Sequence, residues 1–174
     1  MKKLRYRIFF LLVVIAFSAC EKDDICVDGD TPLLVIDFLD FEDTENETPK
    51  VVPSIRVIGV GKTPIPTFND PPAQERTDLE SIVIPLDPTV TSVSFVFIND
   101  SADNDDGVET GNLDTLTFNY TVKEKFVSRA CGFIAIYENL DFTLTGDDEN
   151  WIGRVEIDTN LVEDQSRTHV KIFH

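Results

Sequence analysis

The chain has 174 residues, of which 32 are acidic and 15 are basic, so its formal net charge is −17. This length suits a single domain, and an apolar fraction of 42% excludes a wholly disordered chain. The charge also excludes a nucleic-acid-binding protein, because phosphate recognition requires clustered lysine and arginine side chains.

Residues 1–19 have the layout of a secretory signal peptide. Positions 2–7 carry four basic residues, residues 8–17 form an unbroken apolar run, and two small residues follow. The apolar run is too short for a transmembrane helix, which needs about 20 residues. We therefore expect residues 1–19 to be removed from the mature protein.

Residues 17–20 (FSAC) resemble a bacterial lipobox, in which the cysteine is acylated on sulfur and the chain is cut just before it. Phe17 departs from this motif, where leucine is usual at the same position. The resemblance implies that Cys20 carries several acyl chains and holds the protein stably on a lipid bilayer, which one chain alone does not achieve. The alternative is an ordinary signal peptide that leaves Cys20 as a free thiol.

Lys22, Asp23 and Asp24 follow within an expected tether over residues 20–30. A lysine followed by two acidic residues at this position resembles the surface-export signal of Bacteroidota lipoproteins. It implies an outer-membrane location at the cell surface; the alternative is the periplasmic leaflet, with these residues as a solvated linker. Without residues 1–19, the 11 basic and 32 acidic residues that remain give a net charge of −21, which keeps the domain off an anionic lipid surface.

Cys26 and Cys131 remain as a pair once Cys20 is acylated. In an oxidising compartment we expect them to form a disulfide, which would close a loop of about 105 residues and contribute roughly 4–5 kcal/mol in the chain-entropy model. The alternative is two buried free thiols that act as small hydrophobic side chains. Neither cysteine has the neighbours of a catalytic thiol.

Residues 31–174 have the pattern of a β domain, because period-two alternation and runs of β-branched and aromatic residues recur between turn signals. Three acidic or proline-rich stretches, residues 42–53, 64–78 and 99–112, are expected to be loops. The pattern predicts an all-β fold, a single antiparallel β-sandwich that is immunoglobulin-like in general architecture. About nine short strands are expected, at residues 33–39, 54–60, 81–86, 92–98, 115–122, 132–137, 141–145, 154–158 and 169–173.

Four segments carry a resemblance to a known family: residues 31–36 (TPLLVI), 114–120 (DTLTFNY), 127–132 (VSRACG) and 169–173 (HVKIF). Together they resemble a family of flavobacterial lipoproteins of unknown function, over nearly the whole mature chain. That family has no assigned activity. The resemblance therefore implies an origin and a lipid anchor, and no chemistry.

Residues 59–63 (GVGKT) imitate the end of a phosphate-binding P-loop. The motif requires a glycine at position 56, which is arginine, and a helix that Pro64 and Pro66 would prevent. We expect a turn at the end of a strand.

Acidic residues crowd positions 100–109 and 147–149, where carboxylates on a turn could attract calcium. An EF-hand alignment fails, because it places Ala102 and Leu113 at ligand positions. We expect a solvated acidic loop without a metal ion; a calcium site of another kind is the alternative.

His169 and His174 are the only histidines, and no nucleophile motif accompanies them. In a strand these two side chains would face opposite sides, so we do not expect them to hold a metal ion together. We expect no enzymatic activity and no cofactor. The alternative is a carboxylate-based, calcium-assisted glycan hydrolase, because paired carboxylates can cleave glycosidic bonds.

Five residues are candidates for contact with sugars or for their attachment. Trp151, Tyr120 and Tyr137 could stack on a sugar ring, although a lone tryptophan at the start of a strand is more often part of the core. Ser101 and Thr115 lie in Asp-Ser/Thr-apolar tripeptides, which resemble the sites at which Bacteroidota O-glycosylate exported proteins. Ser101 is the better candidate, because we expect its loop to be exposed.

Together these features predict a lipid-anchored, exported envelope protein whose domain is a non-catalytic structural, accessory or binding subunit. Its expected partners are the bilayer, through Cys20, and another envelope protein or a glycan. Sheet edges and long loops are where such a partner would dock.

Overall fold

The structure is a computed structural model of the chain, and it describes residues 26, 29–62, 64–65, 76–145 and 149–174. These residues form strands and no helix, which confirms the all-β prediction. Ten strands lie in the described part: β1 (Leu34–Leu39), β2 (Val52–Gly59), β3 (Pro64–Ile65), β4 (Thr77–Leu79), β5 (Ser81–Ile84), β6 (Ser92–Asp103), β7 (Glu109–Ser128), β8 (Gly132–Thr145), β9 (Arg154–Ile157) and β10 (Val170–Phe173).

The strands form two sheets. One sheet has the order β5-β1-β10-β9, and the other has the order β3-β2-β6-β7-β8, with β4 also paired to β2. Every pair is antiparallel except β1 with β10, the first and last strands, which run parallel. The sandwich prediction is confirmed, with this one parallel pair added to it.

The core lies between the two sheets, where alternate side chains of each strand point inward. Leu34, Ile36 and Phe38 of β1 and Leu116 and Phe118 of β7 are fully buried and belong to one hydrophobic cluster. Each such side chain contributes about 1.5–3 kcal/mol through its burial. The apolar positions of the alternation read from the sequence are therefore the ones that face the core.

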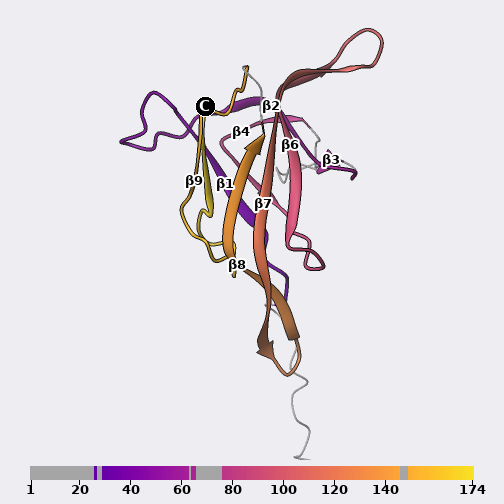
Figure 1. Ribbon diagram of the computed structural model, residues 1–174, viewed down its shortest axis with the longest axis vertical. Helices are drawn as coiled ribbons and strands as arrows, with labels where there is room; N and C mark the ends of the chain where they lie inside the picture. The colour runs from indigo at the N-terminus through magenta and orange to yellow at the C-terminus, as the bar shows by residue number, and fades with distance from the viewer. Residues whose placement is uncertain (1–25, 27–28, 63, 66–75, 146–148) are drawn as a thin grey trace, which may run out of the picture.

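Three strands are much longer than expected, because two hairpins continue beyond the sandwich. Strands β6, β7 and β8 have 12, 20 and 14 residues. The β6–β7 hairpin projects at the upper end of Figure 1, and the β7–β8 hairpin projects at the lower end as a two-stranded ribbon. Residues 132–137 and 141–145, expected as two strands, are one strand that bends at Asn139, whose φ is 55°.

The prediction of a long acidic loop at residues 99–112 is wrong. Strands β6 and β7 stay paired up to Asp103 and Glu109, and only residues 104–108 form the turn. A bulge near Asp100 lets the pairing continue, and Gly111 lies opposite it with φ 123°, where a Cβ atom would come within 2.7 Å of the Asn99 carbonyl oxygen.

Two arginines explain why this acidic segment forms a sheet. Arg76 donates to both carboxylate oxygens of Asp103 at 2.7 and 2.8 Å, and Arg56 forms an ion pair with Glu109. The expectation that Ser101 lies in an exposed loop is also wrong: it is 4% exposed in β6, accepts a 2.7 Å hydrogen bond from Arg76 Nε and donates to Glu109. The opposite charges come from β2 and from the segment before β4, far away in the sequence.

Candidate functional site

The residues expected to carry the lipid anchor and the export signal, Cys20, Lys22, Asp23 and Asp24, lie outside the described residues, as does the signal peptide. Cys26 and Cys131 are described, and a disulfide joins them with their Cα atoms 4.8 Å apart. This agrees with the predicted pairing. The disulfide lies at the tip of the β7–β8 hairpin, so the segment before the first strand is fixed to the end of the ribbon.

Gly29 lies directly against this disulfide. A Cβ atom on Gly29 would lie 2.3 Å from Cys26 Sγ and 3.2 Å from Cys131 Sγ, so only glycine fits there without a shift. On the hairpin side, the Ser128 hydroxyl accepts a 3.0 Å hydrogen bond from the Cys131 backbone N–H. The disulfide is thus packed against Gly29 on one side and supported by the Ser128 hydrogen bond on the other.

We call residues 123–136, the part of the ribbon beyond the Val122–Tyr137 pair, the distal hairpin. Phe126 and Phe133 lie directly opposite each other on its two strands, with ring centroids 5.3 Å apart in an edge-to-face arrangement. They are 56% and 65% exposed. Two neighbouring aromatic rings in water are unusual, because each loses the stabilisation that burial would give it.

The distal hairpin also differs in charge from the rest of the protein. It contains Lys123, Lys125 and Arg129 and one acidic residue, Glu124, which is a net charge of +2 in a chain whose total is −17. All four side chains are exposed. A small basic and aromatic tip therefore extends from an acidic body.

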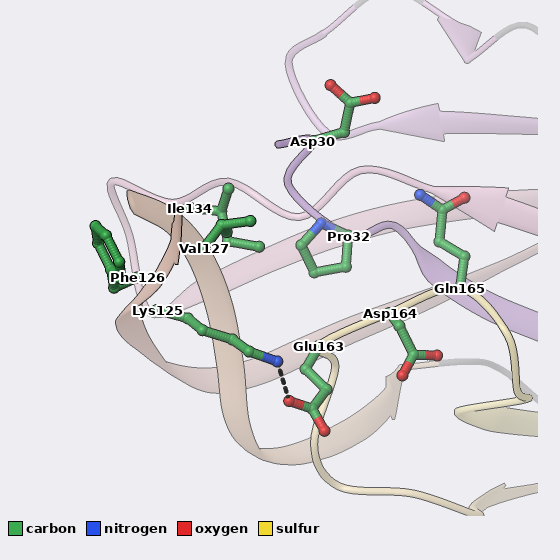
Figure 2. A pocket seen from close by; sticks show the side chains of 9 residues that line it. All are labelled: Asp30, Pro32, Lys125, Phe126, Val127, Ile134, Glu163, Asp164 and Gln165. Atoms are coloured by element: carbon green, nitrogen blue, oxygen red, sulfur yellow. Dashed lines mark hydrogen bonds and ion pairs between the residues drawn. The ribbon is translucent and has the colours of Figure 1, made fainter. Parts of the chain in front are cut away.

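A groove runs along one side of the distal hairpin (Figure 2). Its walls are residues 30–32, residues 125–127 with Ile134, and residues 163–165, and its volume is about 490 Å³. Lys125 Nζ forms a 2.6 Å ion pair with Glu163 across it, while Phe126 lies at the outer end, away from Pro32. The groove thus has apolar walls at Pro32, Val127 and Ile134 and charged side chains at its rim.

One acidic side chain of the groove, Asp164, has a lowered pKa. Asp164 accepts hydrogen bonds from the hydroxyl and the backbone N–H of Ser166, and these bonds lower the pKa of Asp164. Among the described residues, no three His, Cys, Asp or Glu side chains gather closely enough to hold a metal ion. Asp147 and Asp148, part of the expected acidic turn, lie outside the described residues.

The two histidines have separate structural roles. His169 is buried, and its Nδ1 accepts a 3.1 Å hydrogen bond from the Val35 backbone N–H. His174 packs edge-on against Phe38 and Trp151. Burial lowers the pKa of both imidazoles, because their charged forms lose solvation there.

The aromatic residues considered for sugar stacking belong to the core. Tyr120 and Tyr137 are buried with ring centroids 5.1 Å apart, and the Tyr137 hydroxyl donates a 3.0 Å hydrogen bond to the Leu86 carbonyl oxygen. Burial raises the pKa of Tyr137 to about 12. Trp151 packs against the core and donates to the Phe97 carbonyl oxygen at 3.3 Å, which confirms the core interpretation of this residue.

Two other sequence-predicted positions lie within the sheets. Gly59 ends β2, and the backbone N–H of Lys62 donates a 2.8 Å hydrogen bond to the Gly59 carbonyl oxygen. The segment that resembles a P-loop is therefore a turn at the end of a strand, as expected. Thr63 lies outside the described residues. Thr115 is half-buried in β7 between Val96 and Thr145 of the flanking strands.

Sequence reasoning did not identify the distal hairpin or its two exposed phenylalanines. The available indication was their symmetry: Phe126 and Phe133 flank the turn of residues 129–131 at nearly equal distances, with basic residues on the approach. The hydrophobic pattern could not reveal it, because Phe126 and Phe133 are exposed and do not pack in the core.

Residues 54–174, more than half of the chain, match the model described as Family of unknown function (DUF6452). The chain belongs to this family. The DUF6452 match contains both hairpins and Cys131, but it begins after Cys26 and after residues 31–36, one of the four segments on which the sequence resemblance rested. No curated protein and no solved structure matches the chain.

The DUF6452 description assigns no activity. Within the described residues, no helix has the length and apolar character needed to cross a membrane.

Proposed function

We propose that this DUF6452 member is a lipid-anchored, exported envelope protein, and that its β-sandwich is a non-catalytic binding or accessory domain. The observation that carries the proposal is the Cys26–Cys131 disulfide. Disulfides persist in oxidising compartments outside the cytoplasm. The chain has three cysteines, so this pairing leaves Cys20, at the lipobox-like junction, as the one cysteine available for acylation.

The behaviour of the carboxyl groups supports a non-catalytic domain over a glycan hydrolase. A hydrolase needs one carboxyl group with a raised pKa to act as general acid. Six carboxyl groups of the described part have a pKa that hydrogen bonds and nearby charges lower: Asp40, Asp43, Asp87, Asp103, Glu109 and Asp164. None of these six groups has the raised pKa that a general acid needs.

Replacing the lipobox cysteine tests the anchor. Cys20→Ser should move the protein from the membrane fraction to the soluble fraction, because it removes the acylation site. Cys26→Ser is the matched control, since it also removes one cysteine but keeps Cys20, and it should stay with the membranes. A Cys20→Ser protein that still sediments with the membranes would contradict the anchor.

The cell-surface location has its own test. Alanines at Lys22, Asp23 and Asp24 should protect the protein from protease added to intact cells, if these residues direct it to the surface. Asp105→Ala is the control, because it changes the net charge by the same one unit at an exposed turn of the body. Equal protease sensitivity of the wild type and the alanine variant would place the export signal elsewhere.

A further inference from the structure

We propose that the tip of the distal hairpin is a membrane-contact surface: Phe126 and Phe133 enter the headgroup region of the bilayer, and Arg129 binds the phosphate groups of its lipids. This inference rests on the lipid anchor of the proposed function. Three independent features of the chain support it.

The first feature is the short connection between the lipid and the hairpin. Six residue steps separate Cys20 from Cys26, and each step of an extended chain spans at most about 3.6 Å, so Cys26 lies within about 22 Å of the acylated residue. The disulfide places Cys131 with its Cα atom only 4.8 Å from that of Cys26. Without the disulfide, the first residue held in a sheet would be Leu34 of β1, 14 steps from Cys20 and about 50 Å away when extended. The tip is thus the part of the fold that the anchor holds against the bilayer.

The second feature is the chemistry of the tip. Exposed aromatic rings beside lysine or arginine are the composition of segments that lie in the membrane interface, where the rings reach about 5–10 Å into the boundary and the cations meet lipid phosphates. Phe126 and Phe133 form one aromatic pair, so they present a single wedge. The +2 charge of the distal hairpin complements an anionic lipid surface, which repels the acidic body.

The third feature is the distance between the tip and the body. The nearest acidic wall of the sandwich, residues 163–165, lies beside Lys125, whose charge pairs with Glu163. From Lys125 to Ser128 the strand rises about 10 Å, which is about one Debye length in physiological salt. The hairpin is therefore long enough for Arg129, at its turn, to reach the phosphates while much of the repulsion between lipid and body is screened.

Quenching by brominated lipid tests the contact directly. The acylated, full-length mature protein is reconstituted into vesicles of phosphatidylethanolamine and phosphatidylglycerol that contain acyl-chain-brominated lipid. A Phe133→Trp variant should lose at least about half of its added fluorescence relative to unbrominated vesicles, because the ring lies at the acyl boundary. Val108→Trp, at the tip of the opposite hairpin and 59% exposed, is the matched control and should not be quenched.

Vesicle flotation separates failure of the anchor from failure of the contact. If the wild-type protein does not float with the vesicles, both the anchor and the contact are overturned. If it floats but Phe133→Trp is quenched no more than Val108→Trp, the contact alone is overturned and the anchor stands. Cross-linking of the tip to a protein of the native envelope, with no quenching in vesicles, would also overturn the lipid assignment.

A second measurement does not depend on a tryptophan variant. Trypsin cleavage after Arg129 should be about ten-fold slower on vesicles than in detergent, because the bilayer shields the turn. The double variant Phe126→Ser/Phe133→Ser, which alters only exposed side chains, should remove most of this protection while the protein still floats. Equal cleavage of the wild type on vesicles and in detergent would contradict the proposal.

Discussion

The two hairpins that share strand β7 leave the sandwich at opposite ends and are held in different ways. The β6–β7 hairpin is acidic and is held by charge, through Arg56 and Arg76. The β7–β8 hairpin has a basic tip and is held by the covalent bond between Cys26 and Cys131. The comparison teaches that a ribbon beyond the core needs its own source of stability, since a two-stranded ribbon alone is marginal in water.

The largest expected effect comes from removing the covalent bond. Cys131→Ser should lower the free energy of unfolding by about 4–5 kcal/mol, because it frees a loop of about 105 residues in the unfolded state. Urea denaturation of the purified mature protein measures this. The double variant with Cys26→Ser should be no less stable than either single variant; a further loss would mean that the cysteines act independently of the disulfide.

A smaller loss of stability is expected when the β6–β7 hairpin loses the Glu109 carboxylate. Burial alone would raise the pKa of Glu109, but hydrogen bonds from Ser101 and Arg76 and the charge of Arg56 outweigh it, so the pKa is lowered. Glu109→Gln should cost about 2 kcal/mol, since charged hydrogen bonds of this kind contribute about 1.5–3 kcal/mol.

The pH dependence of Glu109 gives a second readout. Because its pKa is lower in the folded state, its contribution is fully present above the unfolded pKa and is lost as the pH falls through the folded value. Glu109→Gln should therefore weaken the loss of stability in acid. Asp103→Asn, at a more exposed partner of Arg76, should cost less than Glu109→Gln, and the reverse order would contradict the central role of Glu109.

A pH response near neutrality should belong to the body and to neither hairpin. His169 and His174 have lowered pKa values in the folded protein, so the unfolded chain takes up protons first as the pH falls below about 6.5. Stability should fall with pH in that range, by at most about 1.4 kcal/mol per pH unit for each proton. Thermal melts between pH 7.5 and 5.5 would show this.

His169→Asn isolates one of the two imidazoles. An asparagine can accept the hydrogen bond from the Val35 N–H without titrating, so the slope of stability against pH should decrease in this variant. An unchanged slope would assign the response to His174 or to other groups.

The smallest effect is expected at the groove. The Lys125–Glu163 ion pair is exposed, and exposed pairs contribute about 0–1 kcal/mol. Lys125→Ala should change the free energy of unfolding by less than about 0.5 kcal/mol. A loss comparable to that of Glu109→Gln would show that the two hairpins depend on charge to the same degree.

The sequence predicted the parts of the fold that bury side chains. The alternation in residues 115–122 located the central part of β7, because Leu116, Phe118 and Tyr120 point into the core. It did not predict that the strand continues to Ser128, since the exposed residues there pack against nothing in the core. Hydrophobic periodicity indicates which residues contact the core. It gives no signal for the part of a strand that extends beyond the core.

The acidic hairpin was missed for a different reason. In the sequence, residues 99–112 look like a solvated loop. The side chains that neutralise their charge, Arg56 and Arg76, are distant in the sequence, and their neighbouring residues do not indicate these contacts. The disulfide at the other hairpin was predictable, because counting three cysteines and assigning one to the anchor left a single pair. The anchor at Cys20 remains a prediction.

The parallel pairing of β1 with β10 has a consequence for synthesis of the polypeptide. Among the described strands β9 pairs with β10 alone, and β10 also pairs with β1, so residues 170–173 join an early and a late part of the chain into one sheet. A nascent chain that lacks these four residues cannot close that sheet, which makes folding depend on contacts between distant segments and therefore slow. Clipping a few residues from the C-terminal end should accordingly separate β9 from β1 and leave β1 paired with β5 alone in the described part of that sheet.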